Sequence, residues 1–415
     1  MSPVRSLLFS TLYPSSVRPG HGIFVETRLR ELLKSGEAEC KVVAPVPWFF
    51  STHERFGTYG LMARTPEREM HNGIDVIHPR YLLIPKYGMS AAPFTLALGA
   101  VPAIRKLIRE GFDFDVIDAH YFYPDCVAGA LLSKWFRKPL VITARGSDVN
   151  LIAQYAVPRR LMVNATRTAH ASVTVSAALR NRLIELGVDA AKTVVLRNGV
   201  DLDRFHPQPQ GEARGRLGLA PGPLLLSVGN LVGNKGHHLV IEAIARLPEF
   251  QLVIAGQGPE RGALEALALQ LGVAARVTFS GQVAQKDLPA YYSAADILVL
   301  ASEREGWPNV LLESMACGTP VVATNVGGVP EIIGPPCTGR VVAQRSVGDL
   351  VDGITSLWRD YPDRSAVTAY AQGFGWEETT RAQLALFRDA SGASLKQPAP
   401  ESHIARFPVG PDKYH

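Results

Sequence analysis

The alternation of short apolar runs with helical patterns is the feature of this 415-residue sequence that most limits its fold. Strands that alternate with helices form parallel sheets, because each crossover helix returns the chain to the same edge of the sheet. The strands predicted in this way are 5–10, 41–45, 115–120, 140–144, 172–175 and 193–196, then 224–228, 251–255, 276–279, 297–300, 321–323 and 340–342.

A polar stretch rich in Pro and Gly, residues 206–215, separates the two sets of strands and predicts a linker. Two domains are also the natural expectation for this length. We therefore predict α/β domains at residues 1–205 and 216–374. The predicted helices of the first half are 24–35, 125–136, 159–169 and 177–186, and the chain should end with a helix over 375–390 and a loose tail over 391–415.

Composition places the chain among well-buried globular proteins, with 47% apolar and 20% charged residues. Its four cysteines lie far apart without a Cys-x-x-Cys pair, so neither a zinc site nor a disulfide framework is predicted, and a reducing, cytoplasmic compartment is expected. The apolar run at the N-terminus is too short for a signal peptide. Residues 87–104 lack charges but contain Pro93 and Pro102, which favours a buried helix pair or loop over a membrane span.

Charge is distributed unevenly along the chain. Residues 1–205 hold 26 Lys and Arg against 18 Asp and Glu, a net charge of +8, whereas the rest carries −3. Two interpretations stay open: a surface for anionic lipid or a phosphate-linked acceptor, or ordinary surface variation. Nucleic acid is not a predicted partner, because no basic module with interleaved aromatic residues is present.

The segment from Glu305 to Pro320 carries the strongest chemical pattern. Glu305 precedes a Gly-Trp-Pro turn, and Glu313 lies in the apolar run that follows. Pro308 suits the first turn of a helix, so Glu305 is expected just before the helix N-terminus and Glu313 inside the helix. Free N–H groups at that end favour an anion, and a nearby carboxylate can hold hydroxyl groups. The segment would suit a nucleotide-sugar diphosphate.

The run from Glu305 to Glu331 resembles the donor-site signature of the family four retaining glycosyltransferases. Its Gly-Trp-Pro-Asn-Val version resembles the branch that makes teichuronic acid and exopolysaccharides. The resemblance implies the GT-B fold, in which two Rossmann-like domains face each other across a cleft. It also implies a metal-independent retaining transfer from a nucleotide-diphosphate sugar to a glycan or lipid-linked acceptor, with no cofactor.

The resemblance assigns roles to particular residues. Glu313 would hold the ribose, and Glu305 and His120 would hold hydroxyls of the donor sugar and act in catalysis. The residues expected to bind the rest of the donor are Gly22, Asn230, Lys235, Val283, Gly306, Trp307, Pro308, Asn309 and Val310. Gly20 and Arg145 are expected near the acceptor or a phosphate. Many relatives have Arg where this sequence has Asn230. Asn230 can still donate hydrogen bonds, and Arg304 and Arg145 are the candidates to supply a second positive charge.

Three other functions remain open from the sequence. A nucleotide-sugar 2-epimerase shares the two-domain plan, and a noncatalytic sugar-nucleotide-binding subunit would tolerate Asn230. A periplasmic sugar-binding protein also has two α/β lobes, but it is disfavoured because neither a signal peptide nor a disulfide pattern is predicted. A metal site at Asp113 and Asp115 is not predicted, because these residues precede a strand instead of following one. The basic first domain and the run Pro47–Phe50 add the hypothesis of peripheral contact with the inner face of the cell membrane.

Overall fold

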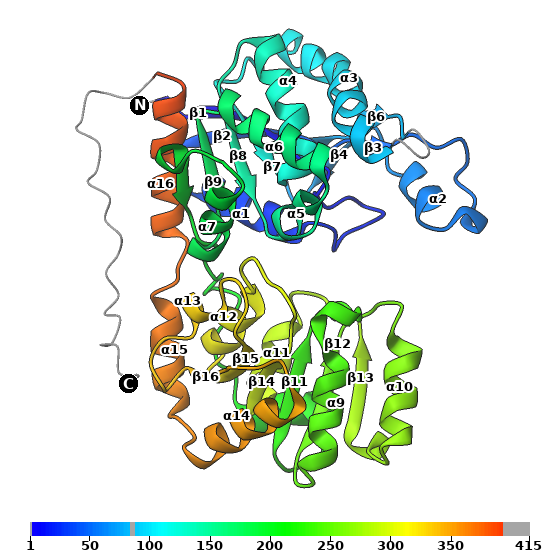
Figure 1. Ribbon diagram of the computed structural model, residues 1–415, viewed down its shortest axis with the longest axis vertical. Coiled ribbons are helices and arrows are strands. Elements are labelled where there is room, and N and C mark those ends of the chain that lie inside the picture. The colour runs from blue at the N-terminus through cyan, green and yellow to red at the C-terminus, as the bar shows by residue number, and fades with distance from the viewer. Residues whose placement is uncertain (1, 84–87, 393–415) are drawn as a thin grey trace.

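The computed structural model describes residues 2–83 and 88–392 and contains two Rossmann-like domains, drawn one above the other in Figure 1. The first domain is built on an eight-stranded sheet with the order β10-β9-β8-β7-β1-β2-β5-β4. Its strands are β1 (Val4–Phe9), β2 (Ala38–Val43), β4 (Arg68–His71), β5 (Ile74–Ile77), β7 (Val116–His120), β8 (Leu140–Ala144), β9 (Ala171–Thr174) and β10 (Thr193–Val195).

The second domain is built on a six-stranded parallel sheet with the order β13-β12-β11-β14-β15-β16. Its strands are β11 (Leu224–Val228), β12 (Gln251–Ala255), β13 (Val277–Gly281), β14 (Ile297–Leu300), β15 (Val321–Thr324) and β16 (Gly339–Val342). In both sheets the strand order reverses beside the first strand, between β1 and β7 and between β11 and β14. Open α/β sheets bind ligands at the carboxyl ends of the strands that flank such a reversal.

Helices cover both faces of the two sheets. Those of the first domain are α1 (Ile23–Lys34), α2 (Gly57–Ala63), α3 (Gly88–Arg109), α4 (Val127–Phe136), α5 (Ser147–Asn150), α6 (Ala156–Thr168) and α7 (Ala177–Glu185). The later ones are α8 (Gln210–Leu217), α9 (His237–Arg246), α10 (Arg261–Gln270), α11 (Leu288–Ala294), α12 (Asn309–Ala316), α13 (Val329–Ile332), α14 (Val347–Arg359), α15 (Arg364–Gln372) and α16 (Glu377–Ala390). The strand pair β3 (Val46–Pro47) and β6 (Arg80–Tyr81) and six short helical segments complete the described elements. These segments are η1 (Glu54–Phe56), η2 (Phe122–Cys126), η3 (Ile152–Gln154), η4 (Ala190–Lys192), η5 (Gly233–Lys235) and η6 (Ala274–Arg276).

The predicted fold class is confirmed, and every predicted strand overlaps an observed one. The prediction missed the hairpin β4–β5, whose strands pair antiparallel at the edge of the first sheet. The prediction of a buried helix pair or loop over residues 87–104 was partly wrong: from Gly88 onward they belong to one continuous helix with a buried face, α3, that contains both prolines. Residue 87, like residues 393–415 of the predicted tail, lies outside the described part of the chain.

The helix α3 is the one described helix that is long and apolar enough to cross a membrane by length and composition. Of its most apolar 18-residue stretch, 44% is buried inside the protein. Leu96, Ala100 and Ile104 lie in the first-domain core together with residues of β1 and β7. The buried face of α3 therefore serves as core of the first domain.

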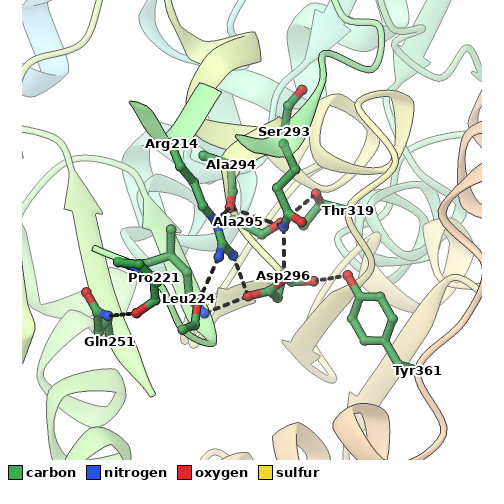
Figure 2. A network of polar contacts seen from close by, with 12 residues as sticks. Arg214, Pro221, Leu224, Gln251, Ser293, Ala294, Ala295, Asp296, Thr319 and Tyr361 are labelled. Carbon is green, nitrogen blue, oxygen red and sulfur yellow. Dashed lines mark hydrogen bonds and ion pairs between the residues drawn. The ribbon is translucent and has the colours of Figure 1, made fainter. Parts of the chain in front are cut away.

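The predicted linker over 206–215 was partly wrong, because its last residues begin the helix α8. Figure 2 shows the cause: Arg214 donates to a carboxylate oxygen of Asp296 at 2.8 Å and to the carbonyl of Ala294 at 2.9 Å. The same carboxylate accepts the N–H of Leu224 at 2.7 Å. These bonds hold α8 against the second sheet although its sequence contains Gly211 and Gly215.

The last helix, α16, lies beside the first domain, whereas α14 and α15 lie against the second (Figure 1). Leu384 and Phe387 of α16 are buried in one cluster with Val25 and Leu29 of α1. The chain therefore crosses between the domains twice, after β10 and before α16, and Val200 donates its N–H to the carbonyl of Phe374 at 2.8 Å where the two crossings meet. The domain limits at 205, 216 and 374 remain predictions from the sequence.

Candidate functional site

A cleft of about 1110 Å³ separates the two domains and is lined by loops at the carboxyl ends of both sheets. It exceeds the range of roughly 300–1,000 Å³ that is typical of small-molecule sites. Twelve of the fourteen residues predicted for the site line it: Gly20, Arg145, Asn230, Lys235, Val283, Glu305, Gly306, Trp307, Pro308, Asn309, Val310 and Glu313. The loops after β1 and β8 face the loops after β11, β13 and β14 across this cleft.

Glu305 is held by two donors of the second domain. Its Oε1 accepts from the ammonium group of Lys235 and from the hydroxyl of Ser302, each at 2.6 Å. The Glu305 side chain is 11% exposed and that of Lys235 is 25% exposed, so both are shielded yet reach the cleft. Since both donors contact one oxygen, the second oxygen of Glu305 is left to accept hydroxyl groups of a ligand.

Glu313 lies deeper, on α12. Its Oε2 accepts from the hydroxyl of the buried Tyr292 at 2.7 Å. Burial raises the pKa of Glu313 to about 7, although Tyr292 and Arg204 act in the opposite direction. A carboxylate with one oxygen anchored and the other at a cleft wall is suited to bind a pair of neighbouring hydroxyls.

The N-terminus of α12 points into the cleft. The helix begins at Asn309, with Pro308 as the residue that precedes its first turn. First-turn N–H groups of a helix have no intrahelical partner and favour anions. Gly306 must be glycine here, because a Cβ atom would lie 2.1 Å from the carbonyl oxygen of Arg145. The donor segment of the second domain thus touches the backbone of the first.

The indole of Trp307 contributes to this contact between domains. It is 7% exposed, and its Nε1 donates to the carbonyl of Asn198 at 3.0 Å. The side chain of Asn198 also donates to Asn309 at 3.3 Å. The side chain of Trp307 therefore packs between the domains. The segment around it, residues 304–310, lines the cleft.

Arg145 lies on the first-domain wall. Its guanidinium group donates to His120 Nδ1 at 2.6 Å and to Asn198 at 3.2 Å, and it lies 5.3 Å from the ring centre of Phe24. Burial lowers the pKa of Arg145 to about 9, and nearby Arg28 acts in the same direction. The group still carries its charge at neutral pH. Asp148 fixes the loop by accepting the N–H groups of Arg145 and Gly146.

Two residues predicted for the site do not line the cleft. His120 is 1% exposed, and its Nε2 bonds Asp118 at 2.9 Å while Nδ1 bonds Arg145. Burial lowers the pKa of His120 to about 4, so the ring is neutral at physiological pH. Gly22 precedes α1 with a φ of 69° and packs against the backbone of Leu12. In this arrangement both residues support neighbours that reach the cleft.

The sequence prediction missed several cleft residues. Asn198 and Arg204 follow β10, and Tyr121 follows β7. The available signal was their position after strands of the first sheet, at the same carboxyl edge as the predicted loops. Within residues 2–83 and 88–392, no three His, Cys, Asp or Glu side chains are grouped to hold a metal ion. Asp113 and Asp115 instead bond Lys138 and the N–H of Arg5.

The fold and the cleft together define a GT-B protein, and sequence comparison identifies its family. Residues 211–374 match the family described as Glycosyl transferases group 1, and residues 64–204 match Glycosyltransferase Family 4. The chain belongs to these glycosyltransferases. It is 34% identical over 363 residues to the putative teichuronic acid biosynthesis glycosyltransferase TuaC of Bacillus subtilis, which covers 85% of this chain and 88% of that protein.

Further relatives agree with this family. The chain is 31% identical over 339 residues to a D-inositol 3-phosphate glycosyltransferase of Mycobacterium tuberculosis, covering 74% of this chain and 68% of that protein. Among solved structures, sucrose-phosphate synthase from Thermosynechococcus elongatus has a TM-score of 0.76 at 22% identity and covers 95% of this chain and all of its own. Anabaena HepE in complex with UDP-glucose has a TM-score of 0.69 at 22% identity, with 92% of this chain and 98% of that chain covered. These matches favour a glycosyltransferase over a 2-epimerase.

Proposed function

We propose that this glycosyltransferase uses a uridine-diphosphate sugar as donor and transfers the sugar with retention of anomeric configuration. The observation that carries the proposal is the grouping of Glu313, Lys235, Glu305 and the start of α12 on one wall of the cleft. Glu313 would accept the ribose hydroxyls, and the first-turn N–H groups of α12 would bind the diphosphate. The choice of uridine is supported by the UDP and UDP-glucose held by the similar HepE structures.

Glu305 is proposed to orient the sugar being transferred. Its free oxygen would accept sugar hydroxyls, and its neighbour Lys235 would stabilise charge on the departing diphosphate. His120 is proposed to act on the donor side through Arg145, since its ring is buried beneath that residue. Val283 and its loop would lie by the base, and Gly20 with the loop after β1 would face the acceptor.

The proposed mechanism needs no divalent ion, because Lys235, Arg145 and backbone N–H groups can together balance the diphosphate. Thorough chelation should therefore leave turnover unchanged. The measurement is sugar transfer or hydrolysis of UDP-glucose before and after treatment with EDTA. A loss of turnover that a divalent ion restores would contradict this part of the proposal.

For the acceptor we propose a glycan or lipid-linked saccharide in polysaccharide biosynthesis, supported by the likeness to TuaC. We also propose a cytoplasmic enzyme that contacts the inner face of the membrane. An exposed aromatic group supports this: Trp48 is 53% and Phe50 is 68% exposed. The ring centre of Phe50 lies 4.5 Å from that of Phe49 and 5.1 Å from that of Phe56.

A panel of nucleotide sugars tests the proposed donor. UDP-sugars should raise the unfolding temperature of the protein, whereas ADP- and GDP-sugars should raise it less, because a ligand stabilises the folded state more the more tightly it binds. The stabilising donor should then be consumed in the presence of acceptor. Stabilisation without turnover would favour a noncatalytic binding subunit, and stabilisation by another base alone would contradict the choice of uridine.

A further inference from the structure

The other basic residues that line the cleft, Lys235, Arg204 and Arg304, each form an ion pair. Lys235 is paired with Glu305, and Arg204 lies 3.6 Å from Asp201. Arg304 lies 3.5 Å from Glu303. In the part of the chain that the structure describes, no carboxylate forms an ion pair with Arg145. Arg145 therefore lacks a direct ion pair among the described residues, although Asp118 and Asp148 lie near enough to favour its charged form.

The hydrogen bonds of Arg145 are also incomplete. Of the five N–H donors of a guanidinium group, one is taken by His120 and one by Asn198. The Nε atom is buried and has no partner among the described residues. A buried donor without a partner is costly. The residue itself lines the cleft, where the remaining N–H groups of its guanidinium are available to a ligand. Planar guanidinium groups bind phosphate and carboxylate oxygens through two parallel N–H groups.

The position of Arg145 is close to the donor segment. Its carbonyl oxygen is in contact with Gly306, and its partner Asn198 bonds Asn309, the first residue of α12. The side chain of Asn198 thus bonds both the guanidinium group of Arg145 and the first residue of α12. An anion bound by the N–H groups of that turn would lie between the second domain and Arg145.

The orientation of Arg145 is fixed by a buried chain of side chains. His120 Nδ1 accepts from Arg145, and Nε2 donates to Asp118, whose carboxylate also accepts from Gln383 of α16 at 3.3 Å. Gln383 in turn accepts from the buried Arg28 at 2.8 Å. A neutral ring with one donor and one acceptor suits both contacts.

We propose that Arg145 binds the diphosphate of the donor from the first-domain side, and that His120, held by Asp118, is the residue that positions it. The inference rests on the proposed function, because it takes the diphosphate to lie at the start of α12. Bound in this way, the negatively charged diphosphate contacts both domains, α12 on the second and Arg145 on the first. The sugar-facing role expected for His120 from the sequence is replaced by an indirect one.

The test compares ligands with and without phosphates. Arg145→Gln should weaken binding of UDP by about tenfold or more, because a charge-assisted bond is lost, and leave binding of uridine unchanged. Inorganic pyrophosphate is the base-free probe, and its binding should weaken as well. If the wild type binds pyrophosphate but not uridine, the proposed uridine specificity is wrong. The effect of Arg145→Gln on pyrophosphate binding still tests the role of Arg145. Equal affinity of wild type and Arg145→Gln for both UDP and pyrophosphate would overturn the inference.

Other variants separate the alternatives. Arg304→Gln should cost less UDP affinity than Arg145→Gln, because Arg304 is already paired with Glu303; the reverse order would assign the second cation to Arg304. If Arg145→Gln loses affinity only for UDP-glucuronate and not for UDP or UDP-glucose, Arg145 binds a carboxylate on the sugar and the inference fails. If Arg145→Gln does not fold, Arg145→Lys replaces it: Lys keeps the charge but loses the two parallel N–H groups, so UDP and pyrophosphate should still bind more weakly than to the wild type, and equal affinity would overturn the inference.

A double-mutant cycle tests the positioning role of His120. His120→Leu should weaken UDP binding several-fold alone and have no further effect when combined with Arg145→Gln, because it acts through that residue. His120→Asn keeps an acceptor near the position of Nδ1 and should retain more affinity than His120→Leu. Additive losses in the double variant would show that His120 does not act through Arg145.

Discussion

At the scale of single residues, the cleft combines groups whose properties depend on their burial. Glu305 is ion-paired with Lys235 and lines the cleft, whereas Glu313 is buried beside Tyr292, and burial raises the pKa of Glu313 to about 7. His120 is kept neutral and bonded at both ring nitrogens. Glu305, Glu313, Lys235 and Arg145 are the charged cleft residues to which the proposed function gives a role.

The raised pKa of Glu313 predicts a pH dependence of nucleoside binding. Ribose hydroxyls donate to the ionised carboxylate, so binding favours loss of the proton. Uridine affinity should rise as the pH is raised through about 7, level off above it, and fall about tenfold per pH unit well below it. Uridine is used instead of UDP because its affinity is free of phosphate titration. Isothermal titration calorimetry across this range makes the measurement.

Glu313→Gln is the control for this dependence. It should bind uridine more weakly than the ionised wild type, since a charged acceptor worth about 1.5–3 kcal/mol is lost, and its affinity should not change with pH. A wild type whose uridine affinity is constant from about pH 5.5 to 8.5 would contradict the ribose role of Glu313.

At the scale of elements, α3 has two different faces. Its buried face packs in the first-domain core, and its outer face carries the exposed Phe94 and Leu98 followed by Arg105, Lys106 and Arg109. Arg105 lies 5.7 Å from the ring centre of the exposed Trp135 of α4. A surface with aromatic and basic side chains together is typical of contact with an anionic membrane.

This surface predicts binding to anionic vesicles that depends on salt. Each basic residue near such a surface adds about 1 kcal/mol at low ionic strength. Replacing Arg105, Lys106 and Arg109 with Gln should therefore reduce sedimentation with phosphatidylserine vesicles strongly. The matched control replaces Arg246, Lys286 and Arg359, which are exposed on the second domain, and should have little effect. Wild-type protein that stays in the supernatant at low salt would contradict membrane contact.

The sequence predicts the elements best where their residues are buried. Strands such as Leu140–Ala144 and Ile297–Leu300 are continuous apolar runs and were predicted to the residue. The hairpin β4–β5 was missed because Arg68–His71 is an edge strand of polar, partly exposed residues. The helix α8 was missed because bonds from Arg214, distant in the sequence from Asp296, outweigh its low helix propensity.

The sequence predicted which residues lie at the site better than it predicted the burial of their side chains. Strand ends and the Glu305–Glu331 pattern placed most residues at the cleft, since both depend on local sequence and on the strand order of parallel sheets. The burial of His120 was not predicted, because it depends on contacts with Arg145 and Asp118. In hindsight Asp118, two residues earlier on the same strand face, was the available signal for a partner.

At the scale of the whole molecule, the described conformation has the domains in contact. Glu331 of the second domain accepts the N–H groups of Ala177 and Ala178 at 3.0 Å, at the start of α7 in the first. It also pairs with Arg197 at 2.8 Å. A carboxylate at a helix N-terminus is stabilising, so this contact favours the closed arrangement.

Removing this contact should shift the protein toward an open arrangement. Glu331→Ala loses several charge-assisted bonds between domains, and turnover should fall about tenfold while uridine affinity of the second domain is retained. Small-angle X-ray scattering should record a larger radius of gyration. Glu265→Ala, which breaks an exposed pair with Arg261 within α10, is the control and should change neither quantity. An unchanged radius with unchanged turnover would show that Glu331 does not hold the domains together.

The most direct test of a glycosyl-transfer site in this cleft is the turnover of the UDP-sugar donor by wild type and by Glu305→Gln, with UDP affinity measured in parallel. Gln keeps the size of the side chain and one acceptor but loses the charge beside Lys235 and Ser302. Turnover should fall by about 10²-fold, as when one oriented polar group is removed from an active site, while UDP affinity stays within about threefold. Equal turnover in the two proteins would contradict a role for Glu305 in the transfer, and a parallel loss of UDP affinity would make it a nucleotide contact.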